Sequence, residues 1–123
     1  MKNSVIPDWI LKNKEGIKKI LSRFNKKKIL VLGDLILDQF IWGDVSRISP
    51  EAPVPVVWVK KESYMPGGAC NVAHNIIALG ANVALVGIIG EDRTGQFLLS
   101  SLKEIGIDTT GILQDASRLT THK

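Results

Sequence analysis

The sequence predicts an α/β fold in which parallel strands alternate with helices. Two short, uninterrupted apolar runs, at residues 29–32 and 83–89, are typical of strands buried in a parallel sheet. Apolar residues recur at helical spacing over residues 68–79 and again over residues 97–105. Elements that alternate in this order favour right-handed crossovers within one parallel sheet. The 123 residues are enough for one small domain.

The first expected helix precedes this sheet. Within residues 8–24, apolar residues recur at helical spacing from Ile17 onward, with lysines between them. The first expected strand, residues 29–32, follows and leads directly to Asp34. Ligands of open α/β sheets gather at the carboxyl ends of the strands. We therefore expect Asp34 and Asp38 to lie near a binding site.

Residues 40–62 depart from the alternating pattern. Two β-prone runs, 40–42 and 54–59, flank a stretch that is rich in proline. Proline has no N–H to donate to a sheet, so this stretch favours an edge strand or an extended connection. The region therefore predicts a β excursion from the main sheet. Its tryptophans, Trp42 and Trp58, are costly to leave in water; packing on the chain's own core is the alternative to a surface that meets a ligand or partner.

Residues 67–73, Gly-Gly-Ala-Cys-Asn-Val-Ala, open the helix expected over 68–79. Paired glycines let a backbone approach a ligand closely, because no Cβ intervenes. The amides at a helix start point outward and can hold ligand oxygens. Asn71, in the first turn, can both donate and accept hydrogen bonds. This combination suits a polyhydroxylated ligand better than an apolar one.

The remaining elements follow the same alternation. Gly80 is a natural stop for the helix over 68–79, and Gly106 ends the helix expected after the turn at 90–92. Ile112 and Leu113 predict the start of a third strand, and residues 120–123 resemble the opening of one more.

The net charge of +4 is unevenly distributed. Residues 1–28 carry nine Lys or Arg and two acidic residues, giving +7, while the remainder carries seven basic and ten acidic residues, giving −3. A basic flank can contact RNA or anionic lipid. A solvated helix face is the preferred interpretation, because no aromatic residues that could stack on bases interleave with the lysines. We expect no nucleic-acid partner.

Other functional classes lack their motifs. A single cysteine, Cys70, excludes an internal disulfide, and we expect it to be a small packed residue rather than a nucleophile. His74 and His122 lack metal-ligand spacing. Neither a P-loop nor Gly-x-Gly-x-x-Gly is present. With no signal peptide and no apolar run of about 20 residues, a cytoplasmic protein without a membrane partner is expected.

The glycine pair, Asn71, the small Ala73, Gly80 and Gly90 together resemble the N-terminal signature of the ribokinase-like (PfkB) carbohydrate kinases. Residues 32–38, Leu-Gly-Asp-Leu-Ile-Leu-Asp, and the motif of residues 46–57 resemble the heptose 7-phosphate kinase branch. The resemblance runs from about Lys28 to Lys123. It implies a Rossmann-type three-layer sandwich with a small β lid.

The resemblance also implies a division of the chain. Residues 1–28 would form a basic helical extension, and residues 29–123 the N-terminal part of a kinase domain with a lid at about 40–62. In this family the catalytic aspartate, the anion hole and most of the ATP site lie in a Gly-Ala-Gly-Asp region further along. We therefore expect the catalytic base beyond Lys123, with ATP and Mg²⁺ bound mostly outside this chain, and no activity from residues 1–123 alone.

Site residues are transferred from the family to matching positions. Asp38 aligns with an aspartate that binds sugar hydroxyls, and a helix or turn cap is its alternative role. Gly67, Gly68 and Asn71 complete the set. Asp34 either binds sugar or braces the glycine loop. In the same resemblance, Arg47 of the lid either meets the substrate phosphate or stays at the surface, and the lid often pairs two subunits, which implies a homodimer and a small sugar phosphate as partners.

The resemblance implies transfer of the ATP γ-phosphoryl group to the anomeric hydroxyl of D-glycero-β-D-manno-heptose 7-phosphate. Another PfkB-type kinase, acting on ribose, fructose or a nucleoside, is the nearest alternative. A non-catalytic binding or dimerisation module, held together by Trp42 and Trp58, is a second. A truncated gene product with exposed apolar edges is a third.

Overall fold

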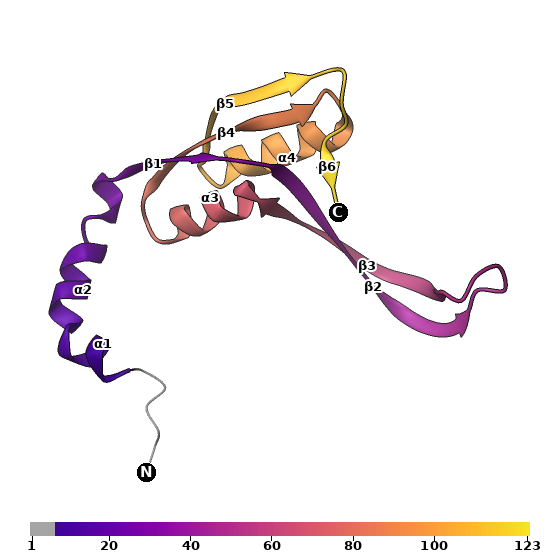
Figure 1. The fold of residues 1–123 in the computed structure, drawn as a ribbon, viewed down its shortest axis with the longest axis horizontal. Coiled ribbons are helices and arrows are strands. Elements are labelled where there is room, and N and C mark those ends of the chain that lie inside the picture. The colour runs from indigo at the N-terminus through magenta and orange to yellow at the C-terminus, as the bar shows by residue number, and fades with distance from the viewer. Residues whose placement is uncertain (1–6) are drawn as a thin grey trace, which may run out of the picture.

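The computed structural model describes residues 7–123, so the first six residues of the expected basic extension lie outside the described part. The helices are α1 (Asp8–Lys12), α2 (Lys14–Leu21), the short 3₁₀ helix η1 (Phe24–Lys26), α3 (Ala69–Ala78) and α4 (Arg93–Glu104). The strands are β1 (Lys28–Leu32), β2 (Leu35–Ile48), β3 (Pro55–Gly68), β4 (Asn82–Gly90), β5 (Asp108–Asp115) and β6 (Thr121–His122). Figure 1 shows their arrangement.

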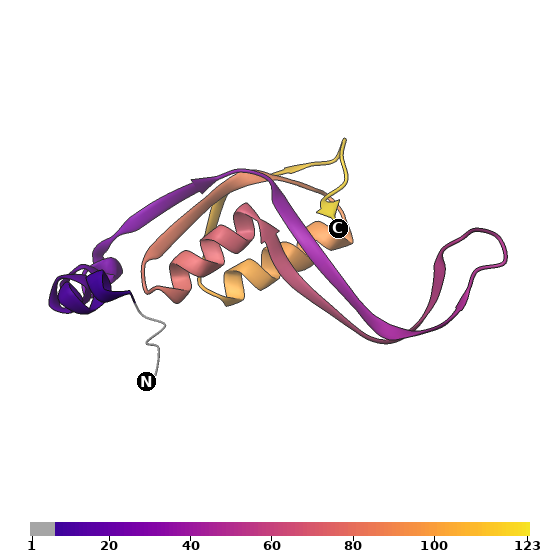
Figure 2. The same ribbon diagram turned by 60° about the horizontal axis from the view of Figure 1, so that its bottom comes forward.

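The central sheet has the order β1-β4-β5, and its strands are parallel. Helix α3 lies between β3 and β4 in the chain, and α4 connects β4 to β5. Both helices cover the same face of this sheet (Figure 2). The predicted α/β class with a parallel sheet is therefore confirmed, and the described residues contribute the sheet and one helix layer.

Both helices end in the same way. Gly80 follows α3 with a φ of +85°, and Gly106 follows α4 with a φ of +84°. The Gly80 N–H donates to the Ile77 carbonyl, and the Ala81 N–H donates to the Ile76 carbonyl. This pattern satisfies the last carbonyls of a helix and needs a residue in the left-handed region. Glycine adopts that region without strain, which is why the two predicted stops are correct.

The core lies between the central sheet and the two helices. It combines inward-facing strand residues with the inner faces of α3 and α4. Its buried members are Leu35, Leu37, Cys70, Ala73, Val83, Leu85, Ile89, Leu98, Leu102 and Ile107.

The expectation that residues 29–32 form a buried strand is wrong for this chain. β1 does pair in parallel with β4, but Leu30 is 67% exposed and Leu32 is 76% exposed. These residues lie opposite Ala84 and Val86, on the face of the sheet that α3 and α4 do not cover. β1 is also an edge strand. An apolar run predicts a strand with two apolar faces, but neighbouring elements decide whether both are covered.

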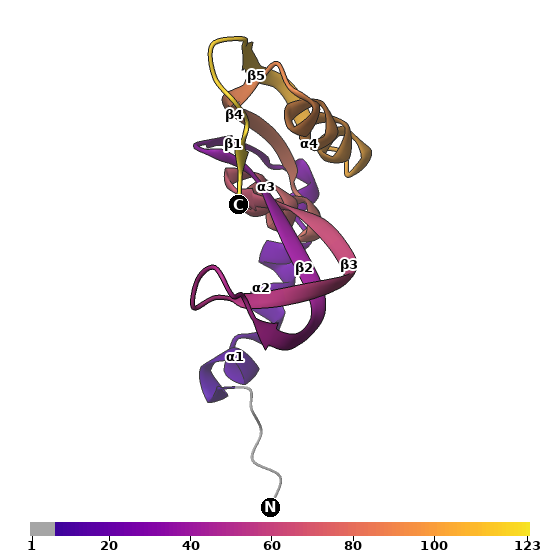
Figure 3. The same cartoon turned by 90° about the vertical axis from the view of Figure 1, so that its right-hand side faces the viewer.

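The β excursion is longer than its predicted span of 40–62. β2 and β3 form an antiparallel hairpin in which Leu35 lies opposite Gly68 and Ile48 lies opposite Pro55. It projects from the sheet and helices as a long twisted ribbon (Figures 1 and 3). Pro50 and Pro53 fall in the connection between the strands, where no ladder hydrogen bond is lost. The β-prone run 40–42 marks only the middle of β2, and the run 54–59 marks only the start of β3.

Residues 120–123 add a short strand, but not to the central sheet. β6 pairs in parallel with β2, so that Ile36 lies opposite Thr121 and Leu37 lies opposite His122. The second sheet therefore has the order β3-β2-β6. This pairing brings the last residues of the chain against the base of the hairpin (Figure 3).

The N-terminal segment contains two short helices rather than the single helix expected over residues 8–24. α1 and α2 meet at Asn13, whose side-chain amide donates to the Trp9 carbonyl at 2.7 Å. α2 buries none of its residues, and both helices extend away from the central sheet (Figure 1). In residues 7–123 no helix combines the length and the apolar character needed to cross a membrane.

Candidate functional site

The connection from β1 to β2 packs against the junction of β3 and α3. The Ala69 N–H donates to the Asp34 carbonyl oxygen at 2.9 Å. Gly68 has a φ of +55°, and a Cβ there would lie 2.5 Å from the same Asp34 oxygen. Glycine is therefore required at position 68 by both conformation and space. Asp34 braces the glycine junction through its main chain, while its carboxylate stays exposed.

Gly67 makes a different close approach. It lies opposite Ile36 in the hairpin, and a Cβ at position 67 would overlap the carboxylate of Asp38. Asp38 is a strand residue of β2, partly buried, so the alternative role of a helix or turn cap is wrong. The absent side chain at position 67 is what gives the Asp38 carboxylate its place.

The start of α3 adds backbone donors to this corner. The first amides of a helix have no carbonyl partner within the helix. Asn71 is exposed on the first turn of α3, three positions after Gly68. The structure therefore gathers Asp34, Asp38, Gly67, Gly68 and the first turn with Asn71 around one corner of the fold. We call this set the Asp38 corner.

Arg47 does not belong to the Asp38 corner in this chain. It lies far along β2, separated from Asp38 by roughly 30 Å of extended strand. It is exposed and lines an open cavity of about 370 Å³ on the hairpin, with Ser46, Val56, Val57 and Trp58. The structure therefore separates Arg47 from the residues with which it was expected to act.

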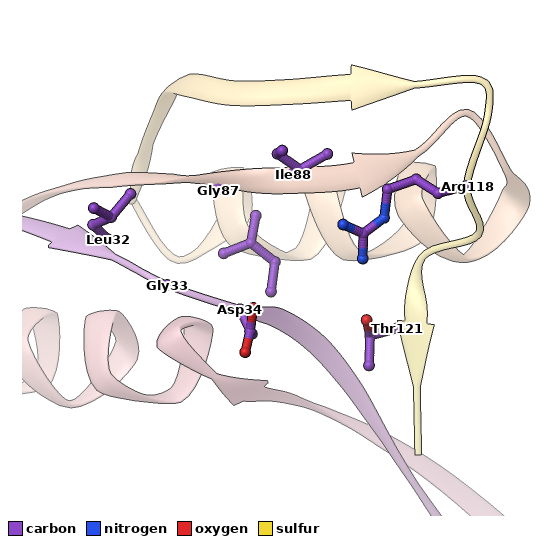
Figure 4. A pocket seen from close by; sticks show the side chains of 8 residues that line it. Leu32, Gly33, Asp34, Gly87, Ile88, Arg118 and Thr121 are labelled. Carbon is purple, nitrogen blue, oxygen red and sulfur yellow. The ribbon is translucent and has the colours of Figure 1, made fainter.

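A cavity of about 260 Å³ opens beside the Asp38 corner, at the carboxyl ends of β1 and β4. Asp34, Arg118 and Thr121 are arranged around it (Figure 4). The remaining lining residues are Leu32, Gly33, Leu35, Gly87 and Ile88. The position agrees with the rule that ligands of α/β sheets bind at these strand ends. The sequence pattern did not indicate Arg118, because it lies in a loop with no motif of its own.

A hydrogen-bonded latch joins the start of α4 to the residue before β6. The Asp92 carboxylate accepts from the Gly95 N–H at 2.7 Å, the Thr120 N–H at 2.8 Å and the Thr120 hydroxyl at 2.8 Å. The Gly90 N–H donates to Thr120 Oγ1 at 2.9 Å. Hydrogen bonds from Thr120 and then Gly95 lower the pKa of Asp92 below its usual range. We call Asp92 and Thr120 with these glycines the Asp92 latch.

The sequence signalled only half of this latch. Asp92 directly precedes a helical pattern, which is a known signature of an N-cap. Thr120 is buried but carries no local signal, since its partners are 28 and 30 positions away in the chain.

A second unpredicted contact reaches Asp38 itself. The ammonium of Lys123 lies 3.0 Å from Asp38 Oδ1. The parallel pairing of β6 with β2 produces this contact, and nothing in the local sequence around Lys123 indicates it.

Cys70 lies in the core rather than at the Asp38 corner. Cys70 is fully buried in the core, and this burial raises the pKa of its thiol to about 11. A thiol with such a pKa is a poor nucleophile at neutral pH. Within residues 7–123, no three His, Cys, Asp or Glu side chains gather as a metal site would require.

Comparison with known proteins agrees with this geometry. The family model described as pfkB family carbohydrate kinase matches residues 26–123. The chain belongs to the pfkB family of carbohydrate kinases. The matched range includes every residue of the Asp38 corner.

Its similarity to individual relatives is high. It is 56% identical over 100 residues to the bifunctional protein HldE of Magnetococcus marinus, which covers 81% of this chain and 20% of that protein. It is 58% identical over 97 residues to the bifunctional protein HldE of Helicobacter pylori strain G27, with 79% and 21% covered. The chain thus spans about a fifth of the length of these relatives.

Solved structures share the fold. The fructokinase of Halothermothrix orenii matches with a TM-score of 0.58 and 32% identity, over 78% of this chain and 32% of that one. A fructokinase of Xylella fastidiosa with bound ATP matches with a TM-score of 0.59 and 30% identity, over 78% of this chain and 28% of that one. The fold is therefore that of the ribokinase-like sugar kinases.

Proposed function

We propose that the full-length protein phosphorylates D-glycero-β-D-manno-heptose 7-phosphate at its anomeric hydroxyl, with ATP as the phosphoryl donor. The observation that carries this proposal is the Asp38 corner, in which a carboxylate, a glycine pair and a helix start meet. The motifs at residues 32–38 and 46–57, which resemble those of heptose 7-phosphate kinases, support the choice of sugar. The relatives named HldE agree with this branch.

In this proposal the chain positions the sugar. The Asp38 carboxylate accepts hydrogen bonds from two neighbouring hydroxyls, which defines both the place and the orientation of the ring. Gly67 leaves room for the Asp38 carboxylate and Gly68 for the Asp34 carbonyl oxygen, so both glycines keep the sugar-binding groups in place. Asn71 adds one donor and one acceptor at the helix start. Such positioning accelerates a reaction by removing the entropic cost of alignment.

The chemical step is a single phosphoryl transfer. The anomeric oxygen attacks the γ-phosphorus of ATP and forms a new O–P bond. The bond between the γ-phosphorus and the bridging oxygen breaks, and ADP leaves with that electron pair. The proton of the hydroxyl passes to a general base, which the family resemblance places beyond Lys123. Because ATP is the donor, we place the reaction in the cytoplasm.

Within residues 7–123 no three acidic, histidine or cysteine side chains lie close enough together to hold a metal ion. We therefore assign none of them to the metal and derive no step through it. ATP itself is supported by the family and by the Xylella fastidiosa fructokinase with bound ATP.

The proposal includes a lid role for the β2–β3 hairpin. Trp42 is 58% exposed and Trp58 is 76% exposed on this ribbon. Exposed tryptophans on a projecting hairpin fit a surface that is covered by a second subunit. We propose that two copies pair through the hairpins.

The test is substitution of Asp38 by Asn in the full-length gene product. Asparagine keeps one acceptor oxygen but loses the second oxygen and the charge; loss of one hydrogen bond to a charged acceptor, worth roughly 1.5–3 kcal/mol, predicts a fall in kcat/KM of about 10-fold or more with heptose 7-phosphate. Glu104→Gln, an exposed change at the end of α4, is the matched control. An Asp38→Asn enzyme with unchanged kcat/KM would remove Asp38 from the site.

A second candidate rests on the solved structures, because two of the similar ones are fructokinases. The full-length wild-type protein should be assayed with heptose 7-phosphate, fructose and ribose in parallel. Preference for heptose 7-phosphate supports our proposal. Preference for an unphosphorylated sugar contradicts it and favours a fructokinase-like or ribokinase-like activity.

A further inference from the structure

Strand β6 carries a cation to the Asp38 corner. The Lys123 N–H donates to the Leu37 carbonyl at 3.0 Å, and the Gln39 N–H donates to the Lys123 carbonyl at 2.7 Å. These two bonds bracket Asp38 on β2. Residues that alternate along a strand share one face of the sheet, so Lys123 shares its face with Thr121 of the cavity.

The charged groups of this pair differ in exposure. The Asp38 side chain is 22% exposed, and the Lys123 side chain is 75% exposed. Asp38 Oδ1 is buried and receives no hydrogen bond of good geometry from the described residues, although Lys123 Nζ lies 3.0 Å away. The contact is therefore mainly electrostatic. The ammonium has three donors, so it can bind a ligand in addition to Asp38.

Residues outside β6 help to position Lys123. Within the Asp92 latch, Thr120 donates two hydrogen bonds to the Asp92 carboxylate and accepts a third from the Gly90 N–H. β6 begins at the next residue. Lys123 is thus positioned by its backbone hydrogen bonds to β2 and by the partly buried hydrogen bonds of Thr120, where β6 begins. A binding residue needs such support.

We propose that Lys123 is a specificity residue, whose ammonium binds the phosphate of a phosphorylated sugar while the neighbouring Asp38 binds the hydroxyls. The inference rests on the proposed sugar-kinase function of the Asp38 corner. A phosphate next to Asp38 alone would be repelled by the carboxylate. Lys123 cancels that charge and adds donors for phosphate oxygens. A neutral sugar needs only the carboxylate, so the cation selects for the phosphate.

Two other basic side chains, Arg47 and Arg118, are alternatives for binding the phosphate, but neither contacts Asp38. Arg47 is separated from Asp38 by roughly 30 Å of extended strand. Arg118 lines the adjacent cavity but lies in an exposed loop, and its charge acts on Asp115. Only Lys123 among the three is in contact with Asp38.

The test measures the preference for phosphate with two pairs of sugars in the full-length gene product. Titration calorimetry gives the Kd of heptose 7-phosphate against unphosphorylated heptose, and of fructose 6-phosphate against fructose. Of the two sugar phosphates, the one that the wild type binds should bind Lys123→Met at least 10-fold more weakly. The affinity for the same sugar without its phosphate should change by less than about threefold. Lys123→Arg should retain most of the preference, because it keeps the charge.

Controls separate this role from a structural one. Lys103→Met removes an exposed positive charge at the end of α4 and should leave both affinities unchanged. Equal weakening of both members by Lys123→Met would show that Lys123 only positions Asp38, and would overturn the inference. It would also be overturned by no weakening at all, by loss of the preference in Arg118→Met instead, or by a wild type without any preference for phosphate.

The outcome is independent of the exact sugar. If the wild type prefers fructose 6-phosphate to heptose 7-phosphate, the proposed substrate is wrong. A preference for fructose 6-phosphate over fructose that disappears in Lys123→Met would still support the role of Lys123.

Discussion

Gly67 and Gly68 are adjacent, yet a side chain at each position would meet a different kind of atom. At position 67 the obstacle is the Asp38 carboxylate, the mobile end of a side chain. At position 68 the obstacle is the Asp34 main-chain oxygen, and the residue also has a φ of +55°. A side chain can move away at moderate cost, whereas a backbone atom in a packed junction cannot. Gly67 is therefore needed for the position of the Asp38 side chain, and Gly68 is needed for the stability of the fold.

We predict that Gly67→Ala weakens sugar binding more than it weakens the fold. Displacement of Asp38 should raise the KM for the sugar by about 10-fold, which is the loss of one hydrogen bond to a charged group. Gly68→Ala should instead lower the free energy of unfolding by about 1–3 kcal/mol, because alanine is strained at this φ. Gly16→Ala, in α2 with open space around it, is the control.

Urea unfolding and steady-state kinetics of the full-length variants measure both effects. The interpretation of these positions fails if Gly67→Ala and Gly68→Ala reduce stability and affinity in the same proportion.

At this scale the candidate site residues are those that lie in local motifs, and their roles stay predictions. Gly67, Gly68, Asp38 and Asn71 stand in a spacing that can be read along the chain. Lys123 could not be found in this way, because it reaches Asp38 only through the pairing of β6 with β2.

β6 is the shortest element in the described part of the chain, and the Asp92 latch supports it. The Asp92 carboxylate accepts backbone and side-chain hydrogen bonds from Thr120 and caps α4 through Gly95. These bonds stabilise the ionised form and lower the pKa of Asp92 in the folded chain. A lowered folded-state pKa adds stability that is fully present above the unfolded value of about 3.9 and is lost as the pH falls through the folded value.

We predict that Asp92→Asn destabilises the protein at pH 7 and that the difference from wild type shrinks toward pH 2.5. An amide has one acceptor oxygen in place of two and carries no charge to lose in acid. Urea midpoints at both pH values measure the effect. Asp108 and Asp115 also have lowered pKa values, but they are present in both proteins and cancel in the comparison. An equal difference at both pH values would exclude the ionised carboxylate as the cause.

Element boundaries were predictable where one residue decides them. Gly80 and Gly106 end their helices because glycine alone adopts a positive φ without strain. The ends of β2 and β3 were not predictable, since the ladder extends through polar residues that no β-prone pattern marks.

At the scale of the whole molecule, two exposed apolar regions of the described residues belong to the sheets. One is the uncovered face of the central sheet, with Leu30, Leu32, Ile88 and Leu113. The other is the hairpin with Trp42 and Trp58. Parallel sheets are normally covered on both faces. The apolar residues of the first region are therefore a general feature of this fold class and do not by themselves indicate a binding surface. The projecting hairpin packs against neither α3 nor α4 over most of its length (Figure 3).

We predict that the full-length protein is a dimer and that the double change Trp42→Ser and Trp58→Ser makes it monomeric. Large exposed aromatic rings dominate the energy of an interface, and serine removes nearly all of that apolar area. Trp9→Ser is the matched control, since Trp9 is an exposed tryptophan on α1, outside the hairpin. Sedimentation velocity gives the mass of each species.

A double variant that stays dimeric would exclude the hairpin as the interface. Dissociation of the Trp9→Ser variant instead would place the contact at the N-terminal helices.

The sequence alone determined the alternation of strands and helices, the glycine stops and the glycine-rich helix start, because each depends on residues close together in the chain. The tertiary structure decided the rest. It decided that one face of β1 is exposed and that β6 joins the hairpin. It also decided that Thr120 donates to Asp92 and that Lys123 contacts Asp38. These contacts depend on strand order and register, which arise from burial over the whole fold and leave no periodic trace in the residues themselves.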